Sequence, residues 1–260
     1  MPRLKLTIEY AGTRYSGWQI QKNARTVQGE LERAIHIATG RGEFELYGAG
    51  RTDAGVHALA QVAHLQIDTR IDPVTLTWRI NDELPSDICV LSAERAPAGF
   101  HARHDAIARS YLYQISRRRT AFAKPFVWWV REDLKLGAMR EAAAQFVGMK
   151  DFRSFTADDR DDTSTTVQID RVDIIDRDPL IMVRVIGSHF LWRMVRRLVG
   201  VLVGVGRREL HAADVLRMLT EESDVPAQLT APASGLFLER VYYHGDVVGD
   251  GPGTVMGVGL

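Results

Sequence analysis

Gly48-Ala-Gly-Arg-Thr-Asp-Ala-Gly-Val-His57 is a glycine-rich segment that also contains one arginine and one carboxylate. Residues 43–47 before it have a strand-like composition, and residues 60–67 after it alternate between apolar and polar side chains. Glycine permits backbone conformations that a side chain forbids and lets a ligand come close. We therefore expect a tight loop between two strands that presents Asp53, with Arg51 near enough to favour its ionised form or to hold a phosphate.

The segment admits more than one interpretation. Asp-Ala-Gly is common turn chemistry, and most aspartates in such turns only satisfy nearby backbone groups. A phosphate-binding P-loop is excluded because no lysine follows Gly55. A dinucleotide-binding fingerprint also fails, because Asp53 stands where its third glycine belongs and the next segment alternates like a strand. These residues alone leave a structural and a catalytic Asp53 both open.

Composition indicates a soluble globular protein of one or two domains, with 260 residues that are 45% hydrophobic and 25% charged. The single Cys89 excludes an intrachain disulfide and suits a reducing cytoplasm. No apolar run reaches about 18 residues, so we expect no membrane span, and the N-terminus leads straight into a strand without a signal peptide. The net charge is zero, but arginines cluster at 117–119 and 193–197, which permits an RNA partner without demonstrating one.

The hydrophobic pattern predicts an α/β (α+β) fold of two halves, each in the ferredoxin-like order β-α-β-β-α-β. The expected strands are 4–10, 43–47, 60–67, 88–93, 109–116, 167–175, 180–186 and 236–243, and the expected helices are 27–39, 73–83, 136–147, 190–205 and 215–219. We predict two domains, 1–105 with the Asp53 loop and 106–244 with a basic helix, followed by a flexible glycine-rich tail at 245–260.

Gly-Arg-Thr-Asp-Ala-Gly-Val-His resembles the signature of the tRNA pseudouridine synthase A family, which isomerises uridines 38 to 40 of the anticodon arm. Further matches are the Gly-Trp-Gln box at 17–19, the Arg-x-Tyr-x-Tyr box at 109–113 and Met-Val-Arg at 194–196. The resemblance covers about Leu4 to Tyr243. It implies two halves related by pseudo-symmetry, a mainly antiparallel sheet with helices packed on it, and a catalytic cleft between the halves.

The resemblance also implies roles for particular residues. Asp53 would be the nucleophile at ribose C1′, or would assist formation of a glycal. Tyr111 would stack on the target base and is a candidate for proton transfer, while Arg196 would pair with Asp53. Arg51 would fill the space that the flipped base leaves or clamp the backbone. The remaining candidates for substrate binding are Trp18, Gln19, His57, Arg193 and Arg197; core packing or a solvated helix face is the alternative for several of them.

The implied reaction is an isomerisation, so we expect no cofactor and no metal. His101-x-x-His104 could suggest a metal, but neither a cysteine nor a clear carboxylate completes a site. The expected partner is tRNA, bound by a cytoplasmic homodimer. Three alternatives stay open: a synthase of the same family with another RNA target, a non-catalytic tRNA-binding protein, and a metal-dependent phosphate-ester hydrolase that uses Asp53 with the histidines.

Overall fold

The computed structural model describes residues 2–158 and 164–248, which divide into two compact units. The first unit extends through Ile107 and also includes the segment that begins at Phe237; the second extends from Ala108 to Leu236. Most of the expected flexible tail, 245–260, and most of the acidic run 158–162 lie outside the described residues. Within the described ranges, no helix has the length and apolarity needed to cross a bilayer.

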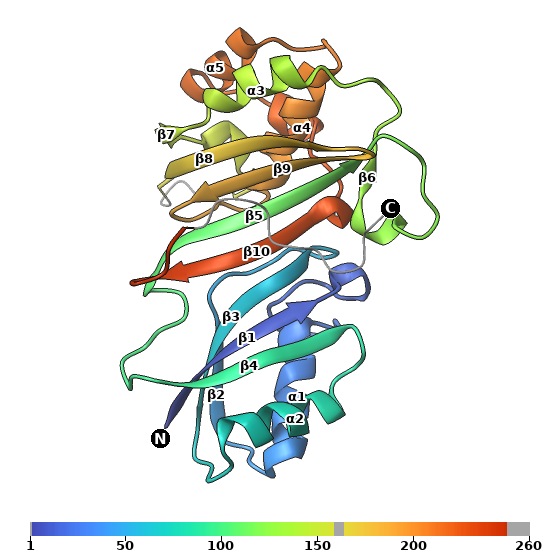
Figure 1. The fold of residues 1–260 in the computed structure, drawn as a ribbon. Coiled ribbons are helices and arrows are strands. Elements are labelled where there is room, and N and C mark those ends of the chain that lie inside the picture. The colour runs from blue at the N-terminus through green and yellow to red at the C-terminus, as the bar shows by residue number, and fades with distance from the viewer. Residues whose placement is uncertain (1, 159–163, 249–260) are drawn as a thin grey trace. The chain divides into compact units, whose positions relative to one another are not determined.

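The first unit has the predicted order β-α-β-β-α-β (Figure 1). Its elements are β1 (Arg3–Tyr10), α1 (Val27–Thr39), β2 (Phe44–Gly48), β3 (His57–Ile67), α2 (Pro73–Glu83) and β4 (Ile88–Ala96), with a 3-10 turn η1 (Gly12–Arg14) after β1. Strands β4, β1, β3 and β2 are neighbours in that order, and all three pairings are antiparallel. Strand β10 (Leu236–Tyr243) joins this unit by pairing parallel to β3.

The helices of the first unit begin and end where their capping residues predict. The Thr26 hydroxyl accepts a hydrogen bond from the N–H of Gly29 at 3.3 Å, and Gly40 ends α1 in the left-handed conformation with φ 65°. The Asp72 carboxylate caps α2 by accepting from the N–H of Thr75 at 3.0 Å, and Pro73 follows as the first helical residue. Alternate residues of β1 and one face of each helix are buried together as the core of this unit.

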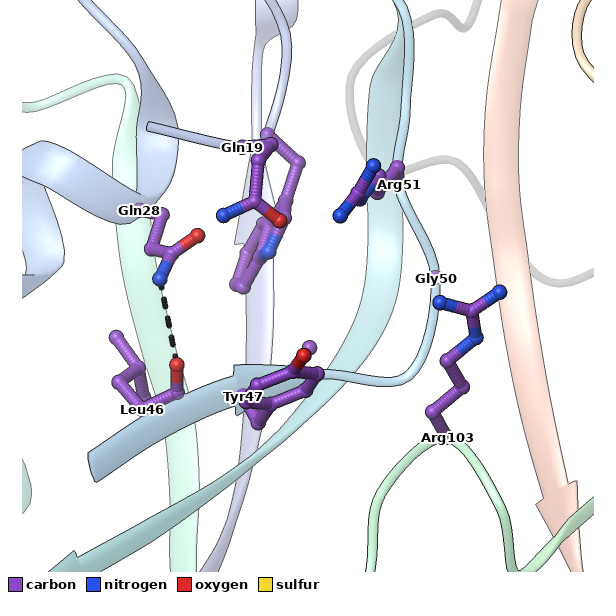
Figure 2. A pocket seen from close by; sticks show the side chains of 9 residues that line it. Gln19, Gln28, Leu46, Tyr47, Gly50, Arg51 and Arg103 are labelled. Carbon is purple, nitrogen blue, oxygen red and sulfur yellow. Dashed lines mark hydrogen bonds between the residues drawn. The ribbon is translucent and has the colours of Figure 1, made fainter. Parts of the chain in front are cut away.

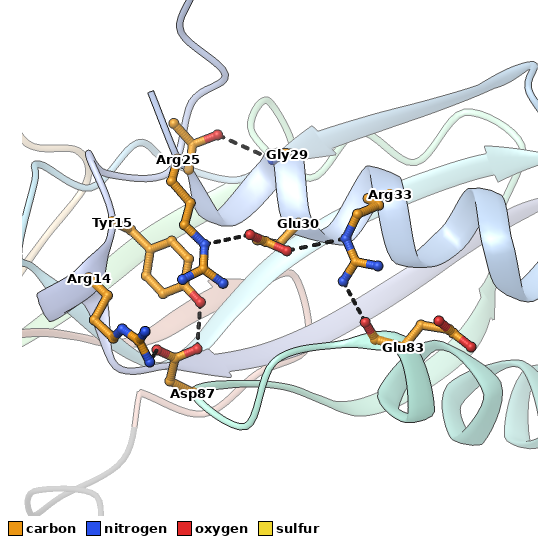
Figure 3. Close-up of polar contacts among 9 residues, drawn as sticks. Arg14, Tyr15, Arg25, Gly29, Glu30, Arg33, Glu83 and Asp87 are labelled. Carbon is orange, nitrogen blue, oxygen red and sulfur yellow. Dashed lines mark hydrogen bonds and ion pairs between the residues drawn. The ribbon is translucent and has the colours of Figure 1, made fainter. Parts of the chain in front are cut away.

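A polar network ties the segment between β1 and α1 to the rest of the unit (Figure 3). The Tyr15 hydroxyl donates to Asp87, which lies just before β4. On α1, Glu30 pairs with Arg25 at 2.6 Å and with Arg33 at 3.3 Å, and Arg33 also donates to a carbonyl of α2. The ion pairs are partly exposed, so each contributes at most about 1 kcal/mol; together they hold the segment against α1 and the start of β4.

The second unit also combines an antiparallel sheet with helices, but it is more elaborate than predicted (Figure 1). Its elements are β5 (Ala106–Ser116), β6 (Trp128–Trp129), α3 (Leu136–Ala144), β7 (Gly148–Asp151), β8 (Thr166–Arg177), β9 (Leu180–Gly187), α4 (Met194–Gly206), α5 (Ala212–Thr220) and α6 (Val225–Gln228), with 3-10 turns at Lys124–Phe126, Arg153–Phe155 and Ala233–Gly235. The antiparallel order is β5-β9-β8-β7, and β6 pairs parallel to β5. Helix α3 packs on β8 and α4. The predicted order omitted β6, β7 and α6.

Helix α4 begins four residues later than the apolar pattern predicts. We expected helix from Phe190, but the first helical residue is Met194. Arg193 precedes it in the left-handed conformation, with φ 60°, so the chain turns sharply at that point. Arg193 therefore lies just before the helix, and of the arginine cluster at 193–197 only Arg196 and Arg197 belong to the expected basic helix.

Candidate active-site loop

The Asp53 segment is a tight turn between β2 and β3, as predicted. The N–H of Val56 donates to the carbonyl oxygen of Asp53 at 3.1 Å, which closes a four-residue turn. Gly55 is its third residue, with φ 79°, a value that a type II turn requires and that glycine adopts without strain. The Gly55 N–H also donates to the carbonyl oxygen of Tyr15 at 3.3 Å. Asp53 itself is half-buried, so the turn fixes its backbone and leaves its side chain partly accessible.

Thr52, immediately before Asp53, is held from two sides. Its carbonyl oxygen accepts from the N–H of Trp18 at 3.1 Å, and its hydroxyl lies 2.8 Å from the hydroxyl of Tyr10. Gly17 makes the approach possible, because a Cβ at that position would lie 2.5 Å from the carbonyl oxygen of Thr52. The Gly-Trp-Gln box thus supports the Asp53 turn through its main chain.

His57 supports the far end of the turn. Its side chain is 1% exposed, its Nδ1 accepts from the N–H of Gly12 at 3.0 Å, and its ring stacks on Phe237 at 4.7 Å between centroids. A Cβ on Gly12 would lie 1.9 Å from the carbonyl oxygen of Val56, so glycine is required for this contact. His57, a candidate for substrate binding, therefore lies in the core, where it supports the Asp53 turn.

Trp18 is buried as well, whereas Gln19 and Arg51 reach the surface. Trp18 is 1% exposed, and its ring centroid lies 6.0 Å from that of Tyr10. Its indole packs against Gly48, so that a Cβ on Gly48 would lie 2.6 Å from Trp18 Nε1. This arrangement corresponds to the core-packing alternative for the aromatic loop. Gln19 is half-buried, Arg51 is exposed, and both line a pocket that opens to solvent (Figure 2).

The candidates of the second unit lie on β5 and around the start of α4. Tyr111 on β5 is 9% exposed and packs edge-to-face on Phe190, with 5.0 Å between centroids. Arg196 Nε donates to the carbonyl oxygen of Ala231 at 2.7 Å, so part of its guanidinium group is fixed within its own unit. The structure brings Trp18, Gln19, Arg51, Asp53 and His57 together in the first unit and Tyr111, Arg193, Arg196 and Arg197 in the second.

The two other predicted arginines have different surroundings. The guanidinium of Arg197 donates to the carbonyl oxygens of Ser154, at 3.1 Å, and of Thr156, so it holds the 3-10 turn against α4. The guanidinium of Arg193 lies 4.9 Å from the centre of the exposed Trp192 ring. Arg193 is exposed at the surface, whereas Arg197 is half-buried.

Sequence reasoning missed a cluster of aromatic and imidazole rings next to the turn. Tyr47 stacks on His64 at 5.9 Å, and His101 contacts both rings, at 5.3 Å from Tyr47 and 4.7 Å from His64. Burial, followed by the positive charges of His101 and Arg3, lowers the pKa of His64 to about 4, so this ring is neutral near pH 7. The repeated histidines at 101 and 104 were the only local signal for this cluster.

Comparison with known proteins identifies the family. The sequence pattern described as tRNA pseudouridine synthase matches residues 6–105 and 142–244. Proteins named tRNA pseudouridine synthase A are 42% identical in Rhodopseudomonas palustris (strain BisA53) and 38% identical in Ruminiclostridium cellulolyticum, each over 94% of this chain and 100% of the relative. A protein of the same name from Geobacter sp. is 39% identical over 94% of this chain and 99% of its own.

The solved crystal structure of an archaeal box H/ACA sRNP Nop10-Cbf5 complex aligns with a TM-score of 0.37 and 13% identity, over 74% of this chain and 44% of that chain. The sequence similarities define this chain as an RNA-modifying isomerase. It belongs to the tRNA pseudouridine synthase family. The family resemblance read from the Asp53 segment is therefore confirmed.

Proposed function

We propose that this protein isomerises uridines 38, 39 and 40 of the tRNA anticodon arm to pseudouridine, with Asp53 as the acting carboxylate. The observation that carries the proposal is the Asp53 turn, which combines a partly accessible carboxylate with a backbone fixed by hydrogen bonds to Tyr15 and Trp18. A reaction that breaks and remakes a bond at one carbon depends on a fixed geometry. Membership of the family supplies the reaction class.

The reaction breaks the bond between N1 of uracil and C1′ of ribose and forms a bond between C5 and the same C1′. The proton on C5 is lost and N1 gains a proton, so atoms and charge balance without an added reagent. In the proposal, Asp53 attacks C1′ or assists loss of the C2′ proton to give a glycal. Tyr111 stacks on the detached base, and Arg196 pairs with Asp53 and favours its ionised form.

The target base must leave the stack before Asp53 can reach its ribose, which costs a few kcal/mol. We propose that Arg51, exposed two residues before Asp53, takes the space of the flipped base or clamps the backbone beside it. Gln19 and the surface-exposed Arg193 would also contact the tRNA. We also propose that the enzyme acts in the cytoplasm as a homodimer, since two subunits offer a longer basic surface to one tRNA.

Replacement of the carboxylate tests the proposal. Asp53→Asn should lower isomerisation at least about 10⁴-fold, because an amide cannot act as the nucleophile or base. Binding of tRNA should change little. The measurement is release of tritium from an unmodified tRNA transcript that carries 5-tritiated uridine. Asp68→Asn is the matched control, since it removes the same charge from an exposed position just after β3 and should leave turnover unchanged.

Each alternative predicts a different experimental result. A wild-type protein that binds tRNA but releases no tritium would be a non-catalytic binding protein. A protein whose activity is lost with a chelator would be a metal-dependent hydrolase, whereas the isomerase should be insensitive. Normal turnover by Asp53→Asn would refute the assignment of Asp53. Mapping of pseudouridines in tRNA from cells that lack the protein would distinguish positions 38 to 40 from another RNA target.

A further inference from the structure

A pocket opens beside the Asp53 turn in the first unit (Figure 2). Its surface is formed largely by Gln19, Tyr47, Gly48, Gly50, Arg51 and Arg103. The described residues that line it include two arginines and no carboxylate, so it favours an anionic ligand. Asp53 does not line it. The pocket is therefore a neighbouring feature and not the place where the proposed chemistry occurs.

Tyr47 gives this pocket an aromatic surface that is already held in place. Its side chain is 48% exposed although it belongs to strand β2. The buried His64 ring stacks on it with an interplanar angle of 12°, and His101 contacts it at an angle of 60°. A ring that is fixed by its neighbours loses little conformational freedom when a ligand stacks on it. The Tyr47 ring is therefore preorganised for stacking with a planar ring of a ligand.

The same histidines position Arg103. His64 Nδ1 accepts from the N–H of Ala102 at 3.1 Å, and His101 Nδ1 accepts from the N–H of Arg103 at 3.2 Å. The N–H of His101 also donates to the carboxylate of Asp105 at 2.9 Å. These bonds fix the short turn that carries Arg103, whose guanidinium lies beside Gly50 at the edge of the pocket (Figure 2).

The space between these groups is open. A Cβ on Gly50 would meet no atom within 4 Å, so a ligand can approach the main chain there. Figure 2 shows Arg51 and Arg103 on either side of Gly50, with Gln19 on the far side of Arg51. Two guanidinium groups close to an exposed aromatic ring match the two parts of a nucleotide, because arginine binds phosphate and aromatic rings stack on bases.

We propose that this pocket holds an unpaired nucleotide of the RNA substrate, other than the uridine that reacts. Its base stacks on Tyr47, its phosphate lies between Arg51 and Arg103, and the Gln19 amide can reach the base edge. This proposal rests on the proposed function, because it takes the ligand to be part of an RNA substrate. It adds an anchoring site that holds the strand in register beside the Asp53 turn.

Affinity for RNA tests the site directly. The probe is an unmodified tRNA transcript with uridines at 38–40, and the dissociation constant is measured for the full-length protein by fluorescence anisotropy. Tyr47→Ala should weaken binding about tenfold, because it removes the ring on which the base stacks. Tyr47→Phe keeps the ring and should bind within about twofold of wild type. Arg103→Gln should weaken binding and reduce the slope of log affinity against log salt by about one.

Trp78→Ala is the matched control. Trp78 on α2 is 68% exposed in the same unit but does not line the pocket, so its loss should leave affinity unchanged. Equal affinities for Tyr47→Ala and wild type would overturn the proposal, and so would an equal loss in Trp78→Ala. A second readout needs no variant: a transcript that contains 4-thiouridine should crosslink, on irradiation, to the peptides that carry Tyr47 or Arg103. Crosslinks only to other parts of the chain would also overturn it.

The result separates this site from the proposed function. If wild type releases tritium and Tyr47→Ala binds as well as wild type, the pocket proposal fails and the isomerase proposal stands. If wild type releases no tritium but its RNA affinity depends on Tyr47, the isomerase proposal fails and the pocket remains an RNA site.

Discussion

The imidazole of His57 accepts a hydrogen bond from the backbone N–H of Gly12 across 3.0 Å, in a region where both residues are buried. The bond requires that Nδ1 carries no proton. It joins the chain just after β1 to the first residue of β3, and the Asp53 turn lies directly before that residue. A buried N–H without a partner costs about 1–3 kcal/mol, so this contact contributes to the stability of the turn.

His57→Phe should separate the hydrogen bond from the ring packing. Phenylalanine can keep the stack on Phe237 but offers no acceptor to Gly12. We expect a loss of about 1–3 kcal/mol in the free energy of unfolding, measured with urea, and slower tritium release. His36→Phe makes the same change at an exposed position of α1 and should have little effect on either. Unchanged stability in His57→Phe would show that the bond is not needed.

Gly48 and Gly50 should respond differently to the same substitution. A Cβ on Gly48 would lie within 3 Å of three atoms of the buried Trp18 ring, whereas a Cβ on Gly50 meets open space. Gly48→Ala should therefore cost about 1–3 kcal/mol through overpacking, and Gly50→Ala should stay within about 0.5 kcal/mol of wild type. Thermal unfolding of the two variants gives the comparison. Equal melting temperatures would mean that Trp18 shifts freely.

Mild acid should destabilise the first unit through His64. Burial and the charge of His101 lower its pKa from 6.5 to about 4, so the folded state holds this ring neutral while the unfolded state binds a proton. Stability is then fully present above about pH 6.5 and is lost as the pH falls toward 4. Urea unfolding of wild type across this range should show the loss.

The variant His64→Gln should show a shallower decline over the same pH range, since the titrating ring is absent. His36→Gln, which removes an exposed histidine from α1, should decline as steeply as wild type. Carboxylates also titrate over this pH range, but they do so equally in wild type, His64→Gln and His36→Gln. A difference in slope between the proteins therefore reports on the histidine. Identical slopes for wild type and His64→Gln would contradict the role assigned to His64.

Tyr15→Phe should be more costly than weakening the partly exposed ion pairs that Glu30 makes with Arg25 and Arg33. The Tyr15 hydroxyl donates to the partly buried Asp87, and a hydrogen bond to a charged group contributes about 1.5–3 kcal/mol. Glu30→Gln weakens the pairs with Arg25 and Arg33 and should cost less than about 1 kcal/mol. Differential scanning calorimetry would measure both. A larger loss in Glu30→Gln would reverse the expected order.

Features that depend on neighbouring residues could be predicted from the sequence. Thr26, Gly40 and Asp72 cap their helices as expected, because a cap is a contact within a few residues. The Asp53 turn followed from glycine spacing for the same reason. The start of α4 was misplaced because apolar spacing continues through Phe190, while the left-handed conformation of Arg193 has no signal of that kind.

Contacts between distant parts of the chain could not be predicted. Tyr47, His64 and His101 belong to β2, β3 and the loop after β4, and only the register of β2 on β3 places Tyr47 opposite His64. Trp18 and His57 matched family motifs and were candidates for substrate binding, with core packing as the alternative, and both are buried. A motif identifies which residues matter, but whether one touches a ligand or supports its neighbour depends on the packing around it.

The bonds that shape the Asp53 turn run mainly through the main chains of Tyr15, Trp18 and Val56. Exposed side chains such as Arg51 and Tyr47 can therefore be exchanged while these bonds persist. Because of this division, the protein is a suitable starting point for directed evolution of RNA specificity. Surface positions can be randomised while the main-chain bonds keep Asp53 in the same position.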